Sequence, residues 1–117
     1  MKRINRVRKH QEFDAIIKEA HFVKSPHFVI YFHKKEENLT RIGISVSTRN
    51  GNAVKRNLIK RQIRAIVASG YPLDLQLDII IIARVAYNVD KFAETKSELM
   101  GLLAKIGDTN IETKHKN

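Results

Sequence analysis

The most informative segment of this sequence is basic and lies in the middle of the chain, Ala53-Val54-Lys55-Arg56-Asn57-Leu58-Ile59-Lys60-Arg61-Gln62-Ile63-Arg64. On a helix, at about 100° per residue, Arg56, Lys60 and Arg64 stack one turn apart. Asn57 and Arg61 lie beside them and widen the same stripe. Apolar residues gather on an adjoining face, namely Ile59, Ile63, Ile66 and Val67. One face of this helix is therefore suited to a hydrophobic core, and the neighbouring face to a strongly anionic partner.

The charge around this helix is not balanced locally. No acidic residue lies between Glu37 and Asp74, although like charges four residues apart destabilise a helix by about 0.2–0.5 kcal/mol per pair. The whole chain carries 22 Lys and Arg against 12 Asp and Glu, a formal charge of +10. The alternative is a solvated face on a basic protein. The one-sided charge favours a polyanion instead, with nucleic acid as the first candidate.

The composition predicts one domain, residues 1–117, large enough to bury a core. Cysteine is absent, which excludes disulfides and thiolate metal sites. The basic start is not followed by an apolar segment of the kind found in secretory signals. The longest apolar run, Ile79 to Ala83, is too short to cross a bilayer. We therefore expect a soluble, cytoplasmic protein without a membrane partner.

Periodicity predicts an α+β fold in which helices pack against one small sheet. Residues 1–10 form a basic arm that is either merely solubilising or orders along an RNA backbone on binding. Four consecutive isoleucines at 79–82 suit a strand that is covered on both faces, as in a parallel pairing. The expected helices are 11–20, 53–69 with Asn52 as N-cap, and 89–106; the expected strands are 27–33, 41–47 and 77–84; residues 107–117 form a frayed tail.

These segments together resemble the protein subunit of bacterial ribonuclease P. The resemblance is carried by residues 51–64 and extends over nearly the whole chain, through residues 5–9 ahead of Phe13, 28–31, 41–47 and 78–84. It implies a fold like the second domain of ribosomal protein S5, with α-β-β-β-α-β-α order. It also implies a left-handed crossover through the basic helix, against the usual right-handed rule.

The resemblance also implies a function. The protein would join a large catalytic RNA, and the two together would remove the 5′ leader from precursor transfer RNA. Hydrolysis would be done by the RNA with bound magnesium, while the protein binds the catalytic RNA and holds the leader in a cleft. The alternative from another class is a non-enzymatic ribosomal or RNA-chaperone protein of the same fold.

The resemblance places two sets of site residues. Phe13, Ile17 and Tyr31 fall where the leader cleft is lined, although their spacing alone favours a core role. Asn57 could contact RNA or bridge within the protein. Leu58 and Thr48 stand where the family usually has basic residues, so the RNA-binding surface carries fewer cations here. The expected RNA-binding residues are Arg6, Arg8, Lys9, Arg49, Lys55, Arg56, Asn57, Lys60, Arg61 and Arg64.

The sequence offers no convincing catalytic group of its own. Its five histidines show no partner motif of the kind that acid–base catalysis requires. Asp74, Asp78 and Asp90 are scattered and do not resemble a carboxylate set for metal ions. We therefore expect neither a catalytic residue nor a metal site in the protein.

Overall fold

The computed structural model describes residues 3–116, with the side chains of residues 4–108. Its element order confirms the α-β-β-β-α-β-α sequence that the resemblance implied. Three short 3-10 helices flank the longer elements. The elements are η1 (Arg3–Asn5), α1 (His10–Glu19), β1 (His21–Lys24), β2 (Phe28–Lys34), β3 (Arg41–Val46), η2 (Thr48–Asn50), α2 (Ala53–Ala68), β4 (Leu77–Ala83), η3 (Val89–Lys91) and α3 (Phe92–Lys116).

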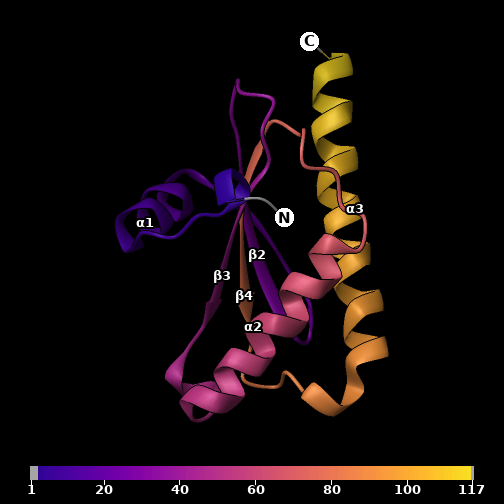
Figure 1. The fold of residues 1–117 in the computed structure, drawn as a ribbon. Coiled ribbons are helices and arrows are strands. Elements are labelled where there is room, and N and C mark those ends of the chain that lie inside the picture. The colour runs from indigo at the N-terminus through magenta and orange to yellow at the C-terminus, as the bar shows by residue number, and fades with distance from the viewer. Residues whose placement is uncertain (1–2, 117) are drawn as a thin grey trace.

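The strands form one mixed sheet in the order β1-β2-β4-β3. The isoleucine-rich strand β4 lies inside the sheet, antiparallel to β2 and parallel to β3. Helix α2 connects the two parallel neighbours β3 and β4. Helices α2 and α3 cover one face of the sheet, and α1 lies on the other (Figure 1). The predicted parallel pairing of this strand and its burial on both faces are therefore confirmed.

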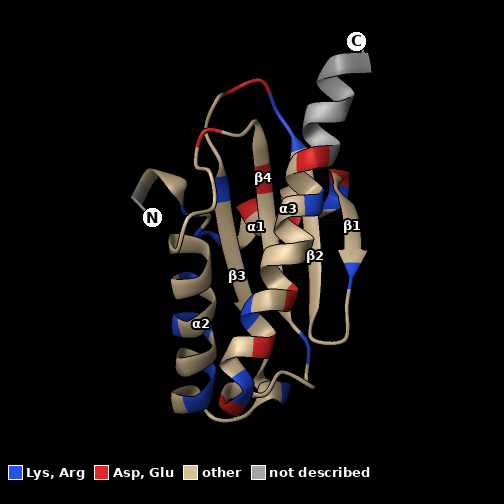
Figure 2. Ribbon diagram, turned by 90° about the vertical axis from the view of Figure 1, so that its right-hand side faces the viewer, with Lys and Arg blue, Asp and Glu red and all other residues tan. Residues whose placement is uncertain are grey.

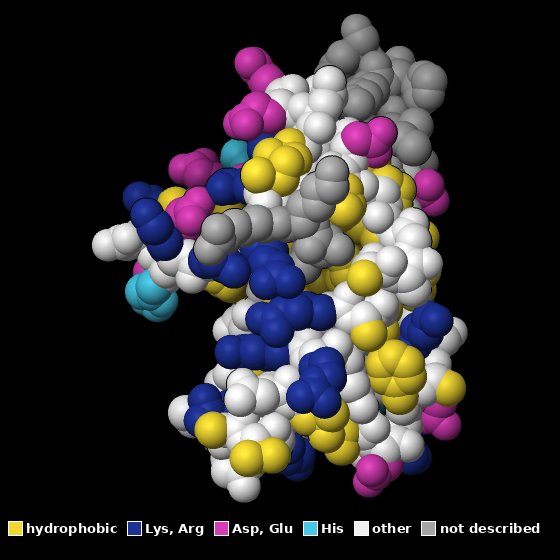
Figure 3. Space-filling model, in the orientation of Figure 1, with side chains coloured by type: hydrophobic (Ala, Val, Ile, Leu, Met, Phe, Trp, Pro, Cys, Tyr) yellow, Lys and Arg dark blue, Asp and Glu magenta, His cyan; other side chains and the backbone are white. Residues whose placement is uncertain are grey.

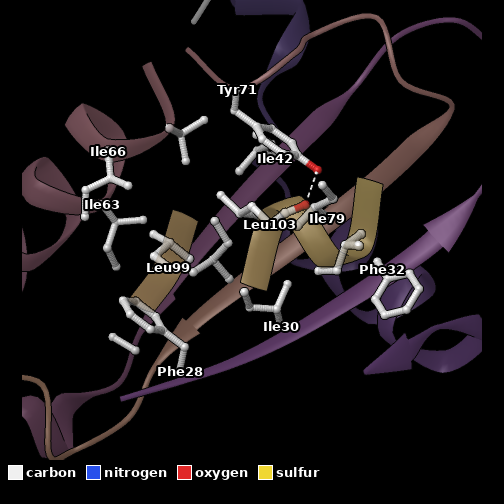
Figure 4. Close-up of a cluster of buried hydrophobic side chains, with 14 of the residues drawn as sticks. Phe28, Ile30, Phe32, Ile42, Ile63, Ile66, Tyr71, Ile79, Leu99 and Leu103 are labelled. Carbon is white, nitrogen blue, oxygen red and sulfur yellow. Dashed lines mark hydrogen bonds between the residues drawn. The ribbon is translucent and has the colours of Figure 1, made fainter. Parts of the chain in front are cut away.

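The main core lies between the sheet and helices α2 and α3. Alternate residues of β2 and β4 point into it, including Phe28, Ile30 and Ile79, and all three are fully buried. Leu99 and Leu103 of α3 meet them there, as Figure 4 shows. The Tyr71 hydroxyl donates to the Leu103 carbonyl at 3.1 Å and ties the loop after α2 to α3. This face of the sheet is thus closed by two helices.

A smaller apolar cluster lies on the α1 face of the sheet. Val7, Ile16 and Ile80 are buried in it, and four partly buried side chains surround them: Phe13, Ile17, Tyr31 and Ile82. A Cβ atom added to Gly43 would lie 2.7 Å from Phe13 Cζ. The glycine therefore lets the Phe13 ring lie directly on the backbone of β3.

An ion-pair network holds α1 to the sheet. Arg41 of β3 donates from Nε and Nη2 to the two carboxylate oxygens of Asp78, both at 3.0 Å, and from Nη1 to Glu12 of α1 at 2.8 Å. Lys35 donates to the same Asp78 at 2.7 Å. Burial alone would raise the pKa of Asp78, but the hydrogen bonds from Arg41 and Lys35 outweigh it and lower that pKa.

The basic helix begins and ends as predicted. The Asn52 side chain accepts a hydrogen bond from the Lys55 amide at 2.9 Å, which makes Asn52 the N-cap. The helix ends at Ala68, and Gly70 follows with φ of +145°, a conformation that favours glycine.

Residue spacing missed one strand and misplaced the end of one helix. Residue spacing gave no strand at 21–24, because four residues are too few to show an alternating pattern. Helix α3 was expected to end at Ile106, but it runs to Lys116. Gly107 lies inside it because a single glycine costs a helix only about 1 kcal/mol and no proline follows. The expected fraying of residues 107–117 remains a prediction, since their side chains beyond 108 are not described.

The N-terminal segment, residues 3–9, is folded against the sheet in the protein alone. Asn5 donates from its buried side chain to the Thr40 carbonyl at 2.8 Å, and the Val7 amide donates to the Ile42 carbonyl at 3.0 Å. Arg6 forms a parallel bridge with Ile42 of β3. The expectation of an arm that orders on binding is therefore corrected for residues 3–9, while residues 1 and 2 lie outside the described part of the chain.

Candidate nucleic-acid interface

Helix α2 presents its cations to solvent. Its apolar side chains, Ile59, Ile63, Ile66 and Val67, are buried in the main core, which turns the basic stripe outward. Lys55, Asn57, Arg61 and Arg64 are exposed, and Arg56 and Lys60 are half-buried. No residue of α2 takes part in an ion pair among the described residues. The cationic stripe is therefore available to an external partner.

The N-terminal segment brings further cations to the same place. A cavity of about 210 Å³ opens where this segment, α1, β3 and α2 meet. Its polar lining consists of arginine and lysine, and the Nε atom of Arg6 is buried with no hydrogen-bond partner in the described structure. The lining residues are Arg6, Val7, Arg8, Phe13, Ile42, Ile44, Lys60 and Arg64.

A second hollow of about 260 Å³ adjoins the first and shares Arg8, Phe13, Ile44 and Lys60 with it. His10, at the start of α1, also lines it. Figure 3 shows Lys and Arg side chains gathered on this face, between the lobe formed by α1 and helix α2. Guanidinium and ammonium groups that converge without carboxylates suit phosphate oxygens, which accept several charge-assisted hydrogen bonds at once. We call this region the cationic cavity.

The three expected leader-cleft residues lie together beside the cationic cavity. Phe13 and Ile17 of α1 and Tyr31 of β2 belong to the apolar cluster on the α1 face, and each keeps part of its surface exposed. Phe13 also lines both hollows of the cationic cavity. The core role that their spacing favoured is therefore only half right. These side chains support α1 and also present apolar surface next to cations, as stacking of single-stranded bases requires.

The remaining predicted RNA-binding residues differ in their surroundings. Arg56 donates from Nε to the Gly51 carbonyl at 3.2 Å, which holds the loop before α2 and leaves its other nitrogens free to bind a ligand. Asn57 is exposed, and its side chain has no hydrogen bond among the described residues, which disfavours a bridging role within the protein. Lys9 and Arg49 are exposed on the segments flanking the cavity. Figure 2 shows the blue positions of α2 repeated along one side of the helix.

Sequence reasoning missed two contributors to this surface. His10 was considered only as a catalytic candidate, yet it lines the second hollow and pairs with Asp14 at 3.3 Å. Phe22, in the strand that residue spacing did not find, is 54% exposed and in contact with Tyr31. The signal available in the sequence for Phe22 was a short aromatic-containing segment directly after a helix. The position of Phe22 beside Tyr31 follows only from the register of β1.

The described residues do not form an evident catalytic or metal site. They contain no group of three or more His, Asp or Glu side chains placed to hold a metal ion. His27 Nδ1 lies 2.6 Å from Glu98, which also accepts hydrogen bonds from Ser25 and from the His27 amide. Burial alone would raise the pKa of Glu98, but these hydrogen bonds lower it. These hydrogen bonds join the start of β2 to α3, on the opposite side of the sheet from α1, and they have a structural role.

Comparison with known proteins identifies the family. The sequence matches the family model described as Ribonuclease P over residues 1–107. The chain belongs to the ribonuclease P protein family. It is 39% identical to the ribonuclease P protein component of Bacillus pumilus over 107 residues, covering 90% of each chain. It is 37% identical to that of Mesoplasma florum, covering 90% of this chain and 97% of the relative.

Solved structures of ribonuclease P proteins share the fold. One is a Staphylococcus aureus RNase P protein mutant with defective mRNA degradation activity, with a TM-score of 0.78, 36% identity and 87% coverage of each chain. Another is the RNase P protein from Thermotoga maritima, with a TM-score of 0.73, 28% identity and coverage of 86% and 96%.

Membership of the ribonuclease P protein family settles the class of the protein. The chain is a protein subunit of the ribonucleoprotein enzyme that matures transfer RNA, and its partner is the ribonuclease P RNA. The alternative of a ribosomal or RNA-chaperone protein is not favoured. Within the described residues, no helix has the length and apolar character needed to cross a membrane.

Proposed function

We propose that the cationic stripe of α2 and the cationic cavity bind the ribonuclease P RNA, and that the cleft beside α1 binds the 5′ leader of precursor transfer RNA. One observation carries the proposal: Phe13 lines the cationic cavity and also belongs to the apolar cluster with Ile17 and Tyr31. Phosphate-binding and base-binding surfaces are thereby continuous. A single strand leaving a folded RNA needs both at once.

The residues in this proposal have separate tasks. The cations of α2 neutralise phosphates without base preference, so their contribution depends on counterion release. The proposed RNA-binding set is Arg6, Arg8, Lys9, Arg49, Lys55, Arg56, Asn57, Lys60, Arg61 and Arg64. Screening between two RNA molecules by these charges also favours magnesium occupancy on the catalytic RNA. Hydrolysis in this proposal is done by the RNA with its bound magnesium, in a cytoplasmic complex.

A salt titration tests the RNA-binding stripe. Arg61→Ala and Arg64→Ala should each weaken binding of the catalytic RNA and reduce the slope of log affinity against log salt by about 1. Lys96→Ala on α3 is the matched control, since Lys96 is exposed and α3 contributes no residue to the lining of the cationic cavity. Unchanged slopes in both arginine variants would remove this stripe from the interface.

Leader recognition is tested on the assembled enzyme. Tyr31→Ala should weaken binding of precursor transfer RNA and leave the affinity for mature transfer RNA unchanged, because only the precursor carries the leader. Tyr31→Phe keeps the aromatic face and serves as the control. Equal losses for the precursor and the mature form would exclude Tyr31 from the leader site.

A further inference from the structure

The sheet carries one cross-strand row of side chains on its α1 face. Phe22 of β1 is directly opposite Tyr31 of β2, Tyr31 is opposite Ile80 of β4, and Ile80 is opposite Gly43 of β3. The Phe13 ring covers Gly43 at the cavity end of this row. Three strand spacings separate the two ends, about 14 Å. The row therefore crosses the whole sheet, from the cationic cavity to the free edge of β1.

Helix α1 runs across the sheet in the same sense as this row. Its first residue, His10, lines the cationic cavity, and its last residue, Glu19, is separated from β1 by Ala20 alone. Ile17 of α1 and Tyr31 of β2 are partly exposed members of the apolar cluster on this face. A strand of RNA that follows α1 from the cavity would therefore arrive at β1.

The far end of the row is an exposed aromatic pair with its own cation. The Phe22 and Tyr31 rings lie 5.7 Å apart between centroids and are inclined at 46°. Phe22 is 54% exposed, and Lys24 Nζ lies 5.9 Å from the centroid of its ring. Lys24 has no carboxylate partner among the described residues. An exposed ring beside a free ammonium group matches a nucleotide, which presents a flat base and a phosphate.

We infer that Phe22 and Lys24 extend the leader track by one further nucleotide position, at the β1 edge, with Phe22 stacking on a base and Lys24 contacting its phosphate. This inference rests on the leader-binding role proposed above. A cation–π contact at an exposed site is weaker than the stacking of a base on an aromatic ring. An incoming base can therefore displace Lys24 from Phe22 and leave its ammonium group free for the phosphate.

The extension makes the protein sensitive to leader length. A short leader would reach Phe13 and Tyr31 but not Phe22, whereas a longer one would also engage the aromatic pair. Stacking accepts any base, so the position should favour the presence of a base over its identity.

The test uses holoenzyme reconstituted with catalytic RNA and precursor transfer RNA whose leaders carry one abasic nucleotide at successive positions. Phe22→Ala should weaken binding of an intact long leader by about tenfold, with Phe22→Trp close to wild type. One abasic position should cause a similar loss in the wild type and no further loss in Phe22→Ala. Lys24→Ala should reduce the salt slope by about 1, whereas Phe22→Ala should leave the slope unchanged.

Val85→Ala is the matched control, because Val85 is also a large exposed apolar residue, at 59% exposure, but lies in the turn after β4. Thermal unfolding of each variant checks that the fold is kept. If Tyr31→Ala weakens leader binding and Phe22→Ala does not, the extension is overturned and the proposed function stands. If neither variant weakens binding of the leader-bearing precursor, both the extension and the leader-binding proposal are wrong.

Discussion

The two faces of the sheet differ in how completely they are covered. The face under α2 and α3 is closed, and Phe28, Ile30 and Leu99 have no exposed surface there. The opposite face is covered by α1 and the short N-terminal segment, and Phe13, Ile17 and Tyr31 remain partly exposed beside unpaired cations. The two faces of one sheet therefore differ in what they leave exposed. Its closed face buries the larger apolar core, and its open face keeps apolar surface and charge available for the RNA ligands proposed above.

The closed face should show the largest loss of stability on mutation. Leu99→Ala removes a fully buried side chain between α3 and the sheet and should lower the free energy of unfolding by about 2–5 kcal/mol. Denaturant unfolding measures the change. A loss below about 1 kcal/mol would mean that this face is not the main source of stability.

Mutation of the ion-pair network behind α1 should cause the second-largest loss of stability. Asp78→Ala leaves Arg41 and Lys35 without their shared carboxylate, and removing one partner of a buried pair is strongly destabilising. Because Arg41 is 28% exposed, we expect about 2–4 kcal/mol in denaturant unfolding, somewhat less than the usual cost of about 3–5 kcal/mol for a buried pair. Asp74→Ala, at an exposed position, should change stability by less than about 0.5 kcal/mol.

The same network predicts a dependence of stability on pH. The pKa of Asp78 is lowered from its ordinary value of 3.8 in the folded protein, so its contribution is complete at pH well above 3.8. It should be lost progressively as the pH falls below that value. Asp78→Asn should flatten the acid limb of the stability profile only in part, because Glu98 also has a lowered pKa. An acid limb identical to that of the wild type would contradict the assignment.

The contact between α1 and the sheet should respond moderately to added volume. Gly43→Ala places a methyl group 2.7 Å from Phe13 Cζ and 2.8 Å from Ile80 Cδ1. Phe13 is partly exposed and can swing aside, so we expect about 1–2 kcal/mol of destabilisation, within the usual range for overpacking. In a double-mutant cycle, Phe13→Ala should remove most of this cost. Additive effects would show that the two positions do not touch.

Mutations of the partly exposed side chains on the open face should change the free energy of unfolding least. Ile17→Ala removes a partly exposed side chain and should cost about 1 kcal/mol, since much of that side chain already contacts water. The same variant should weaken binding of leader-bearing precursor. A stability loss equal to that of Leu99→Ala would remove the distinction between the two faces.

Most of the fold could be predicted where a pattern is long enough to show its period. The basic helix, its Asn52 cap and the isoleucine strand were predicted from local spacing and are confirmed. Residue spacing did not locate strand β1, although the order implied by the resemblance included it, because its four residues cannot show alternation. The end of α3 was misplaced because Gly107 was taken as a stop. The N-terminal segment was taken for an arm because its pairing partner, β3, is 36 residues further along, from Arg6 to Ile42.

Local spacing was enough to predict which side chains α2 turns outward, because the helical period and the positions of its isoleucines are local properties. It also determined that the central strand is apolar on both faces. The folded structure was needed to show that Arg6, Phe13 and Lys60 line one cavity and that Phe22, Tyr31 and Gly43 lie in one row. The reason is that strand order and register come from pairing between distant segments, which local spacing does not encode.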